Sequence, residues 1–265
     1  MLQIVGTVPD EQFPLTRGPA ILEGDCIVVQ DHRIPVNRGT PALIGAAAMA
    51  ADVLGLEPVH ACLAGDIGLG TGSRKLYDHL VKTLPGMSCD ILVFHYLQPD
   101  VDWHNRILFA LDEMEKPPRL IADAGFMYAA KMSGQAGRYD LFTPDVGELS
   151  FLADETAPHP FYTRGFILHQ DNQVPDLIAR ACEYENAARH LLVKGRCDYV
   201  VARGQIIDEI REPSSPEMEA VGGTGDTLTG LACSLLHAGK SMSDACRTAA
   251  EANRVAGCHA NPSPA

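Results

Sequence analysis

The sequence lacks the signatures of several large protein classes. Its eight cysteines include no C-x-x-C pair, so a zinc site or a dithiol redox site is not supported. No G-x-x-x-x-G-K-[ST] element is present, which argues against a P-loop enzyme. Basic residues are few, with 21 Lys and Arg against 34 Asp and Glu, and the net charge is -13. This charge argues against a nucleic acid or an anionic membrane as partner.

Long apolar runs are also absent. The most apolar helical stretch, over residues 41–55, is broken by Asp52 and is too short to span a bilayer. The N-terminus has no basic region followed by an apolar run, so we expect no signal peptide. Several cysteines lie inside apolar runs and are expected to be reduced and buried, which favours a cytoplasmic setting.

The sequence does contain a regular alternation of short apolar runs and helical segments, without an internal repeat. Strands are expected over 26–29, 59–64, 91–96, 119–123, 141–144, 190–195, 199–202 and 206–210. Helices are expected over 41–54, 74–84, 102–114, 148–153, 176–189 and 243–256, with another after residue 222. We therefore predict one α/β domain over residues 1–265, with a mostly parallel sheet covered by helices on both faces.

Two segments do not follow this alternation. Residues 1–24 are rich in Pro and Gly, and we expect them to form an edge strand and a loop. Residues 156–175 are irregular, and an insertion or a mobile lid is the expectation for them. The tail over 261–265 is expected to be frayed.

The most informative stretch is Val221–Gly230, with the sequence VGGTGDTLTG. A glycine-rich turn that opens a helix exposes backbone N–H groups at the positive end of the helix dipole and forms an anion site. A carboxylate beside such a site is explained if it takes the proton of a group that attacks a phosphate. We therefore predict phosphoryl transfer with Asp226 as the base. A helix N-cap Asp in a plain glycine-rich turn is the structural alternative. The predicted anion hole consists of Gly222, Gly223, Thr224 and Gly225.

Three further polar residues, Asp123, Thr143 and Lys194, fall at the ends of predicted strands. Ligands of open parallel sheets bind beyond the carboxyl ends of the strands. If the topology is regular, these side chains lie on the same side of the sheet as the turn that carries Asp226.

Together, these motifs resemble the ribokinase-like superfamily. Residues 218–230 are similar to its glycine-rich signature, and within it they look most like the NAD(P)H-hydrate dehydratases. Phe142–Glu148 resembles the Thr-Pro-His-Pro-Gly-Glu element of that family, with Asp145 and Val146 in place of His and Pro. Leu192–Gly195 resembles its strand that ends in Lys-Gly.

The resemblance to the dehydratases extends from about residue 123 to 257. In the N-terminal half, residues 38–41 and 65–68 follow only the order of the superfamily sugar kinases. The acceptor substrate is therefore less well defined than the fold.

The resemblance implies a reaction. NAD(P)H-hydrate dehydratases use ATP or ADP to phosphorylate the hydroxyl of hydrated NADH or NADPH, and phosphate then leaves to restore the nicotinamide. The sugar-kinase relatives perform the first half only, and both usually require Mg²⁺. Two alternatives stay open: a kinase for a small alcohol or sugar, and a nucleotide-binding sensor without turnover. The intact Asp226 argues against the sensor.

The resemblance also implies roles for further residues. The residues expected at the nucleotide are Lys194, Gly195 and Asn253. Those expected at the metal are Glu148, acting through water, and Asp123. Those expected at the small-molecule substrate are Asn37, Arg38, Gly39 and Asp66.

Two other features suggest different sites. The glycines of residues 68–72, with Asp90 about twenty residues on, are similar to a Rossmann dinucleotide site. However, the spacing is G-x-G-x-G and lacks the third glycine of G-x-G-x-x-G. The remaining histidines of interest have no ligand-like spacing and are predicted to be structural: His95, His104, His159 and His169. The oligomeric state stays open, a homo-oligomer included.

Overall fold

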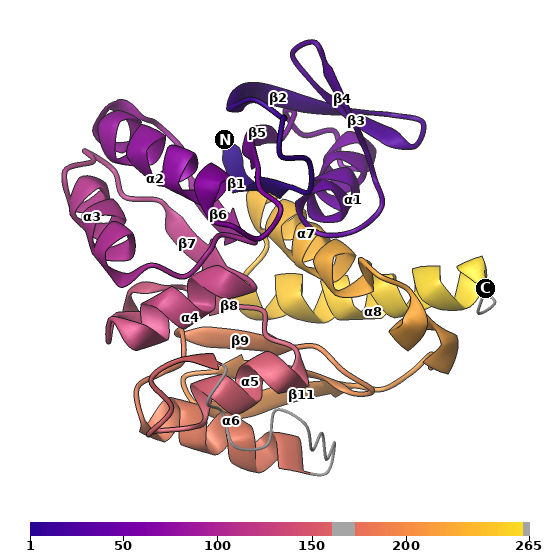
Figure 1. The fold of residues 1–265 in the computed structure, drawn as a ribbon. Helices are drawn as coiled ribbons and strands as arrows, with labels where there is room; N and C mark the ends of the chain where they lie inside the picture. Colours follow the sequence, from indigo (N-terminus) through magenta and orange to yellow (C-terminus); the bar gives the residue numbers. More distant parts are fainter. Residues whose placement is uncertain (161–172, 262–265) are drawn as a thin grey trace.

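The computed structural model describes residues 1–160 and 173–261. Its centre is an eleven-stranded sheet with the order β11-β10-β9-β8-β7-β6-β1-β5-β2-β3-β4 (Figure 1). The six central strands, from β9 to β5 in this order, pair in parallel, and the strands at both ends are antiparallel. The prediction of a mostly parallel central sheet is confirmed. The strands are β1 (Leu2–Val8), β2 (Thr16–Glu23), β3 (Cys26–Val29), β4 (His32–Pro35), β5 (His60–Gly65), β6 (Ile91–His95), β7 (Arg119–Ala122), β8 (Leu141–Phe142), β9 (His190–Val193), β10 (Asp198–Ala202) and β11 (Gln205–Ile210).

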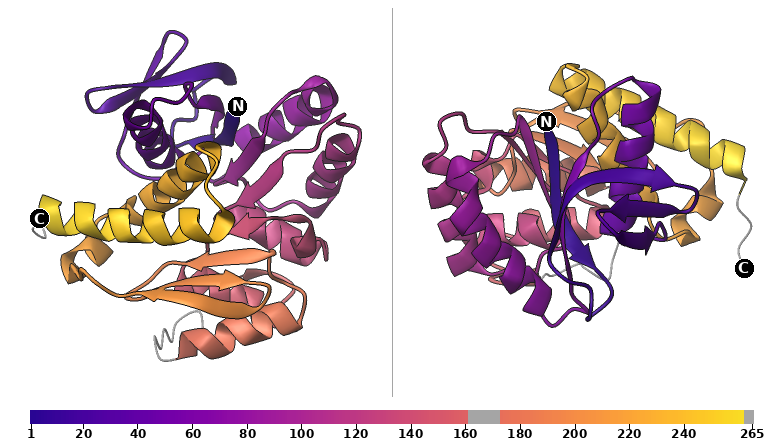
Figure 2. Two further views of the ribbon diagram at one scale, coloured as in Figure 1. Left: turned by 180° about the vertical axis from the view of Figure 1, so that it is seen from behind. Right: turned by 90° about the horizontal axis from the view of Figure 1, so that it is seen from above.

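Helices cover both faces of this sheet (Figures 1 and 2). One face packs against α1 (Thr40–Val53), α7 (Thr224–His237) and α8 (Met242–Ala260). The other face packs against α2 (Thr71–Thr83), α3 (Val101–Asp112), α4 (Gly125–Met132), α5 (Val146–Leu152) and α6 (Val174–Glu183). Each layer buries its own apolar cluster against the sheet, as expected for an α/β fold. Within the described residues, no helix is both long enough and apolar enough to cross a bilayer.

The close packing of α1 on α7 positions the functional edge of the molecule. A Cβ atom at Gly230 would lie 2.2 Å from the Leu43 carbonyl oxygen, so only a glycine allows this approach of two helix backbones. The Ser234 hydroxyl donates to the Ala47 carbonyl oxygen at 2.8 Å. These contacts hold the N-terminus of α7 beside the carboxyl ends of the parallel strands.

The expectation of an edge strand and a loop for residues 1–24 is wrong. β1 lies in the middle of the sheet, between β5 and β6, with Leu2 and Ile4 fully buried. Gln3 and Gly6 interrupt its apolar pattern, which hides the strand in the sequence. The Gln3 side chain is buried and donates to the His60 carbonyl oxygen at 3.3 Å, and the space beside Gly6 is filled by Thr40.

Other predictions are adjusted by the structure. α4 is an additional helix, and the helix expected over 176–189 ends at Glu183, just before Glu185 adopts a left-handed φ of 56°. Of the irregular segment 156–175, residues 161–172 lie outside the described residues, and so does His169. Most of the tail expected to be frayed, residues 262–265, also lies outside them.

Candidate active site

The carboxyl ends of four neighbouring parallel strands bring polar side chains together. His95 ends β6, Asp123 follows β7, Thr143 follows β8 and Lys194 follows β9. Asp226, in the first turn of α7, faces these residues from the helix layer. The strand-end residues and the glycine-rich turn therefore meet at one edge of the sheet, as the sequence predicts.

Asp226 is held at both carboxylate oxygens and is 9% exposed. Its Oδ1 lies 3.0 Å from His95 Nε2, and its Oδ2 accepts the Gly39 N–H at 2.7 Å. Burial alone would raise the pKa of Asp226, but the hydrogen bond from His95 and the positive charge of Lys194 outweigh it, so the pKa is lowered. The carboxylate is therefore kept ionised and able to accept a proton.

The N-terminus of α7 has no side-chain cap. Its N-cap residue is Gly223, with a φ of 96°, whereas α3, α5 and α8 are capped by the side chains of Asp100, Asp145 and Ser241. The helices α1, α2, α4 and α6 also lack a side-chain cap. No acceptor in the described part of the chain takes a backbone N–H of residues 222–225. These four donors lie next to Asp226, at the position where the sequence predicts an anion site.

Lys194 lies beneath this turn. A Cβ atom at Gly225 would be 3.4 Å from Lys194 Cδ, and Lys194 Nζ lies 3.0 Å from each oxygen of Asp123. Burial lowers the pKa of Lys194, but attraction to Asp123 and Glu148 outweighs it and raises the pKa above its ordinary value. The ammonium therefore stays charged beside the turn that carries Gly225.

Asp123 is almost completely hydrogen-bonded within the protein. Besides Lys194, it accepts the Ala124 N–H at 2.8 Å and the Thr229 hydroxyl at 2.7 Å. Thr229 Oγ1 in turn lies 3.0 Å from Thr143 Oγ1. A carboxylate has about four acceptor positions, and protein donors fill those of Asp123. Its geometry suits holding Lys194 in place more than direct metal ligation.

Glu148 is the better candidate for a metal ligand. It forms a capping box with Asp145 at the start of α5, through hydrogen bonds of 2.9 and 2.7 Å. Burial and the negative charges of Asp145 and Asp123 raise the pKa of Glu148 to about 8. A cation would offset this concentration of negative charge, so Glu148 fits a Mg²⁺ site. His95, Asp123 and Asp226 also bring ligand atoms within 4.8 Å of one another, but these atoms are already paired inside the protein.

The other two residues predicted at the nucleotide, Asn253 and Gly195, form hydrogen bonds within the protein. The Asn253 amide donates to the Thr224 carbonyl oxygen at 3.1 Å and accepts the Thr227 hydroxyl at 2.7 Å, which fixes the first turn of α7. The Gly195 N–H donates to Asp198 at 3.1 Å. The Asp198 side chain therefore fixes the position of the backbone at Gly195.

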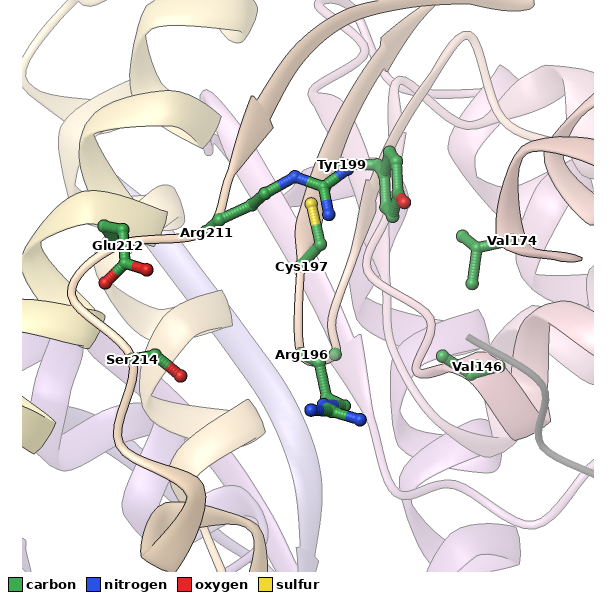
Figure 3. Close-up of a pocket in the computed structure, with 9 residues that line it drawn as sticks. Val146, Val174, Arg196, Cys197, Tyr199, Arg211, Glu212 and Ser214 are labelled. Atoms are coloured by element: carbon green, nitrogen blue, oxygen red, sulfur yellow. The ribbon is translucent and has the colours of Figure 1, made fainter. Parts of the chain in front are cut away.

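An open cavity of about 280 Å³ adjoins Gly195 (Figure 3). It lies between the β9–β10 turn, the segment after β11 and the first residues of α5 and α6. Its lining residues are Val146, Val174, Gly195, Arg196, Cys197, Tyr199, Arg211, Glu212 and Ser214. The cavity thus places free space next to Gly195, one of the three residues predicted at the nucleotide.

Three of the four residues predicted at the substrate lie close to the anion site. A Cβ atom at Gly223 would be 3.0 Å from the Asn37 carbonyl oxygen, and one at Gly222 would be 3.5 Å from Arg38 Cδ. Asn37 and Arg38 are exposed. The loop over 37–39 therefore forms a wall beside this turn, and its Gly39 N–H donates to Asp226.

Asp66, the fourth, is engaged elsewhere. It is 7% exposed and accepts the N–H groups of Gly68, Gly70 and Ser73 and the Ser73 hydroxyl, all within 3.0 Å. Burial would raise the pKa of Asp66, but these donors outweigh it and lower the pKa. Asp66 therefore shapes the loop after β5. Because two glycine N–H groups of this loop are used by Asp66, the loop offers little to a dinucleotide pyrophosphate.

His95, for which the sequence predicts a structural role, lies against Asp226 in the structure. Its side chain is fully buried, with Nε2 on Asp226 and Nδ1 3.0 Å from Thr40 Oγ1. It ends an apolar strand, so the same strand-end rule that identifies Asp123 and Lys194 would have found it. His104 has the structural role that the sequence predicts, since its ring nitrogens contact the Tyr139 and Ser133 hydroxyls. Burial lowers the pKa of His104 to about 4.

Comparison with known proteins identifies relatives of the chain. The profile of the Carb_kinase family, described as NAD(P)H-hydrate dehydratase, matches residues 98–264. An uncharacterised protein of Methanocaldococcus jannaschii is 40% identical over 223 residues, which cover 84% of this chain and 91% of that protein. The ADP-dependent (S)-NAD(P)H-hydrate dehydratase of Cenarchaeum symbiosum is 28% identical over 155 residues, which cover 57% of this chain and 47% of that protein.

Solved structures share the fold. The phosphofructokinase-2 of Escherichia coli, in complex with fructose-6-phosphate, aligns with a TM-score of 0.59 at 14% identity, covering 97% of this chain and 94% of that one. The ADP/ATP-dependent NAD(P)H-hydrate dehydratase of Bacillus subtilis, co-crystallised with ATP/Mg²⁺, aligns with a TM-score of 0.53 at 14% identity, covering 96% and 78%. The predicted ribokinase-like α/β fold is therefore confirmed.

Proposed function

Because the chain belongs to the NAD(P)H-hydrate dehydratase family, we propose that it repairs hydrated NADH or NADPH. In the first step the hydroxyl oxygen of the hydrate attacks the terminal phosphorus of ATP or ADP, and the bond from that phosphorus to the leaving nucleotide breaks. The hydroxyl proton passes to Asp226. In the second step phosphate leaves, a neighbouring ring carbon loses a proton, and the ring double bond is restored.

One observation carries this proposal: an ionised Asp226 lies beside four backbone N–H groups that have no acceptor in the described chain. A base must accept the hydroxyl proton while the transferring phosphoryl group, which is strongly anionic, is held next to it. Donors directed at developing negative charge supply this stabilisation, and each typically contributes on the order of 3 kcal/mol. A pure binding site would gain nothing from a carboxylate at this position.

Lys194 and Glu148 complete the proposed site. The Lys194 ammonium lies beneath Gly225, where it would neutralise phosphate charge, and Asp123 holds it there. Glu148 would hold Mg²⁺ through water, since burial and the negative charges of Asp145 and Asp123 raise its pKa and the positive charge of Lys194 offsets them only in part. The ion would supply further charge neutralisation on the phosphates.

A kinase for a small alcohol or sugar is the second candidate. It is supported by the structural alignment with phosphofructokinase-2, which covers 97% of this chain. It is also supported by the family match, which leaves out residues 1–97. That match begins at residue 98, so the wall formed by residues 37–39 lies outside it. The acceptor is bound next to this wall, and the C-terminal motifs alone do not define it.

One assay separates the candidates. The protein is incubated with hydrated NADH, Mg²⁺ and either ATP or ADP, and the return of the dihydronicotinamide absorbance is followed, with a nucleotide-free control. We expect recovery with at least one nucleotide. Absence of recovery with both, together with phosphate transfer to a sugar or alcohol, would favour the kinase. Nucleotide binding without any turnover would favour a sensor.

A further inference from the structure

A chain of three buried polar side chains ends at the base. Thr40, at the start of α1, contacts His95 at the end of β6, and His95 contacts Asp226 in α7. Both distances are 3.0 Å, and Thr40 and His95 are 1% and 0% exposed. The phosphoryl transfer described above assigns no role to Thr40 or His95. Buried polar groups at this spacing hold one another in fixed orientations.

The surroundings of His95 determine which ring nitrogen carries a hydrogen. Nε2 faces two carboxylates, with Asp226 Oδ1 at 3.0 Å and Asp123 Oδ2 at 3.7 Å. Carboxylate oxygens accept hydrogen bonds, so Nε2 donates whether the ring is neutral or positively charged. Nδ1 faces the Thr40 hydroxyl, which can donate or accept. The assignment of the Nε2 hydrogen therefore follows from the hydrogen-bond network.

The result for Asp226 is a carboxylate fixed at two points. His95 holds Oδ1, and the Gly39 N–H holds Oδ2 at 2.7 Å. Each oxygen has about two acceptor positions, so each keeps one for an incoming hydroxyl. A carboxylate held at both oxygens cannot rotate about its terminal bond, and its remaining lone pairs keep a constant direction toward the acceptor site.

The central strand β1 leaves the space that this arrangement needs. A Cβ atom at Gly6 would lie 2.5 Å from Thr40 Oγ1 and 2.6 Å from the His95 carbonyl oxygen. Only the absence of a side chain at Gly6 allows Thr40 and His95 to approach each other. The contact is thus built by three elements that are far apart in the sequence.

We propose that His95 is a positioning residue for the catalytic base, and that Thr40 holds the His95 ring in the orientation that this requires. The proposal rests on the proposed function, because it assumes that Asp226 accepts the proton of the phosphoryl acceptor. His95 acts through Asp226 and does not touch the substrate. Loss of the contact misdirects the base, which lowers kcat and leaves the binding of nucleotide unchanged.

Two matched pairs of variants test the effect on turnover. Thr40→Val removes the hydroxyl at nearly constant volume, and Thr40→Ser keeps it. His95→Leu removes the donor to Asp226, and His95→Gln keeps an N–H of similar reach. We expect kcat to fall about tenfold in Thr40→Val and about 100-fold in His95→Leu, as for second-layer partners in other sites. The KM for nucleotide should stay within about twofold, and Thr40→Ser and His95→Gln should recover most of kcat. Unchanged kcat in Thr40→Val and His95→Leu would overturn the proposal.

A second measurement is independent of turnover. Long-range ¹H–¹⁵N NMR spectra of the histidine rings show which nitrogen carries the hydrogen, and the His95 signals are those that vanish in His95→Gln. We expect a protonated Nε2 whose resonance shifts in Asp226→Asn, and an Nδ1 resonance that shifts in Thr40→Val and much less in Thr40→Ser. An Nε2 without hydrogen, or an Nε2 signal that does not respond to Asp226→Asn, would overturn the proposal. If the wild type fails to restore NADH, the proposed function fails, while the spectra still decide whether His95 holds Asp226.

Discussion

The N-terminal and C-terminal parts of the chain contribute differently to one carboxylate. Residues 97–261 supply Asp226, the N–H groups of the α7 turn, and the Lys194–Asp123 pair. Residues 1–96 supply the two donors that hold Asp226, the Gly39 N–H and the His95 ring. The family profile covers only the first of these parts. Under the proposed function, the C-terminal part handles the phosphate. The N-terminal part orients the base and lines the acceptor site.

The largest effect on turnover is expected at Asp226, which the C-terminal part supplies and the N-terminal part holds in place. Asp226→Asn keeps the shape of the side chain but removes its capacity to accept a proton, so turnover should fall about 10²- to 10⁴-fold. Nucleotide affinity should stay within about threefold of the wild type, because the N–H donors of the turn are untouched. Steady-state kinetics and calorimetric titration with the nucleotide measure the two quantities. Turnover close to that of the wild type would mean that another group takes the proton.

Lys194→Met tests the phosphate-handling half alone. It leaves Asp123, which is 1% exposed, without its cation, and breaking a buried pair typically costs about 3–5 kcal/mol of unfolding free energy. Turnover should fall as well, because positive charge beneath the anion site is lost. Urea unfolding measures the first effect and the NADH-recovery assay the second.

The double variant Lys194→Met with Asp123→Asn is the matched control. It removes the uncompensated charge, so most of the stability should return while turnover stays low. A single variant as stable as the wild type would show that the ion pair does not hold this part of the site together.

The same division explains how much the sequence predicts. The C-terminal motifs are continuous strings at strand ends or at a helix start, so Asp226, Lys194 and the N–H donors of residues 222–225 are found locally. The parallel sheet also follows from apolar runs that alternate with helices. The antiparallel strands at both ends of the sheet could not be predicted, because the apolar pattern does not specify which strands pair or in which direction.

The N-terminal contributions depend on tertiary contacts. His95 has no neighbour in sequence that marks it, because Thr40 lies 55 positions away and Asp226 lies 131 positions away. β1 is hidden because Gly6 lowers its strand signal, and the reason for Gly6 is the space that Thr40 needs. Features that depend on contacts between distant elements are therefore the ones that sequence analysis missed.

Glu148→Gln gives a smaller effect, visible in the pH dependence of stability. The pKa of Glu148 is raised to about 8 in the folded protein, above the value of 4.5 for a free side chain. The folded state therefore binds more protons than the unfolded chain between these values, and wild-type stability decreases as the pH rises through this range. Gln keeps the capping box without this titration. In metal-free buffer the wild type should lose on the order of 1–3 kcal/mol relative to the variant between about pH 5 and pH 9.

Added Mg²⁺ sharpens this test. If Glu148 holds the ion, Mg²⁺ should restore much of the wild-type stability at the higher pH and should have little effect on Glu148→Gln. Thermal unfolding with and without chelator measures both. Parallel pH profiles for the two proteins would contradict the raised pKa, and an equal response to Mg²⁺ would place the ion elsewhere.

The smallest effect is expected at the wall of the N-terminal half. Arg38 is exposed beside Gly222 and has no ion-pair partner within residues 1–160 and 173–261. In a protein with a net charge of -13, such a guanidinium beside the anion site suits an anionic acceptor. Arg38→Ala should raise the KM of the acceptor about 5- to 10-fold, as for the net contribution of one ordinary hydrogen bond, and leave kcat nearly unchanged.

Arg33→Ala is the matched control for this variant. Arg33 is also exposed in the N-terminal half, but it pairs with Glu23 at 2.6 Å in the β2–β4 region and should leave both KM values unchanged. Arg38→Lys should recover part of the loss, because the charge remains. If Arg38→Ala instead raises the KM of the nucleotide and leaves that of the acceptor unchanged, the wall serves the phosphate donor. The N-terminal half would then take part in phosphate handling, and the division of labour between the two halves would not hold.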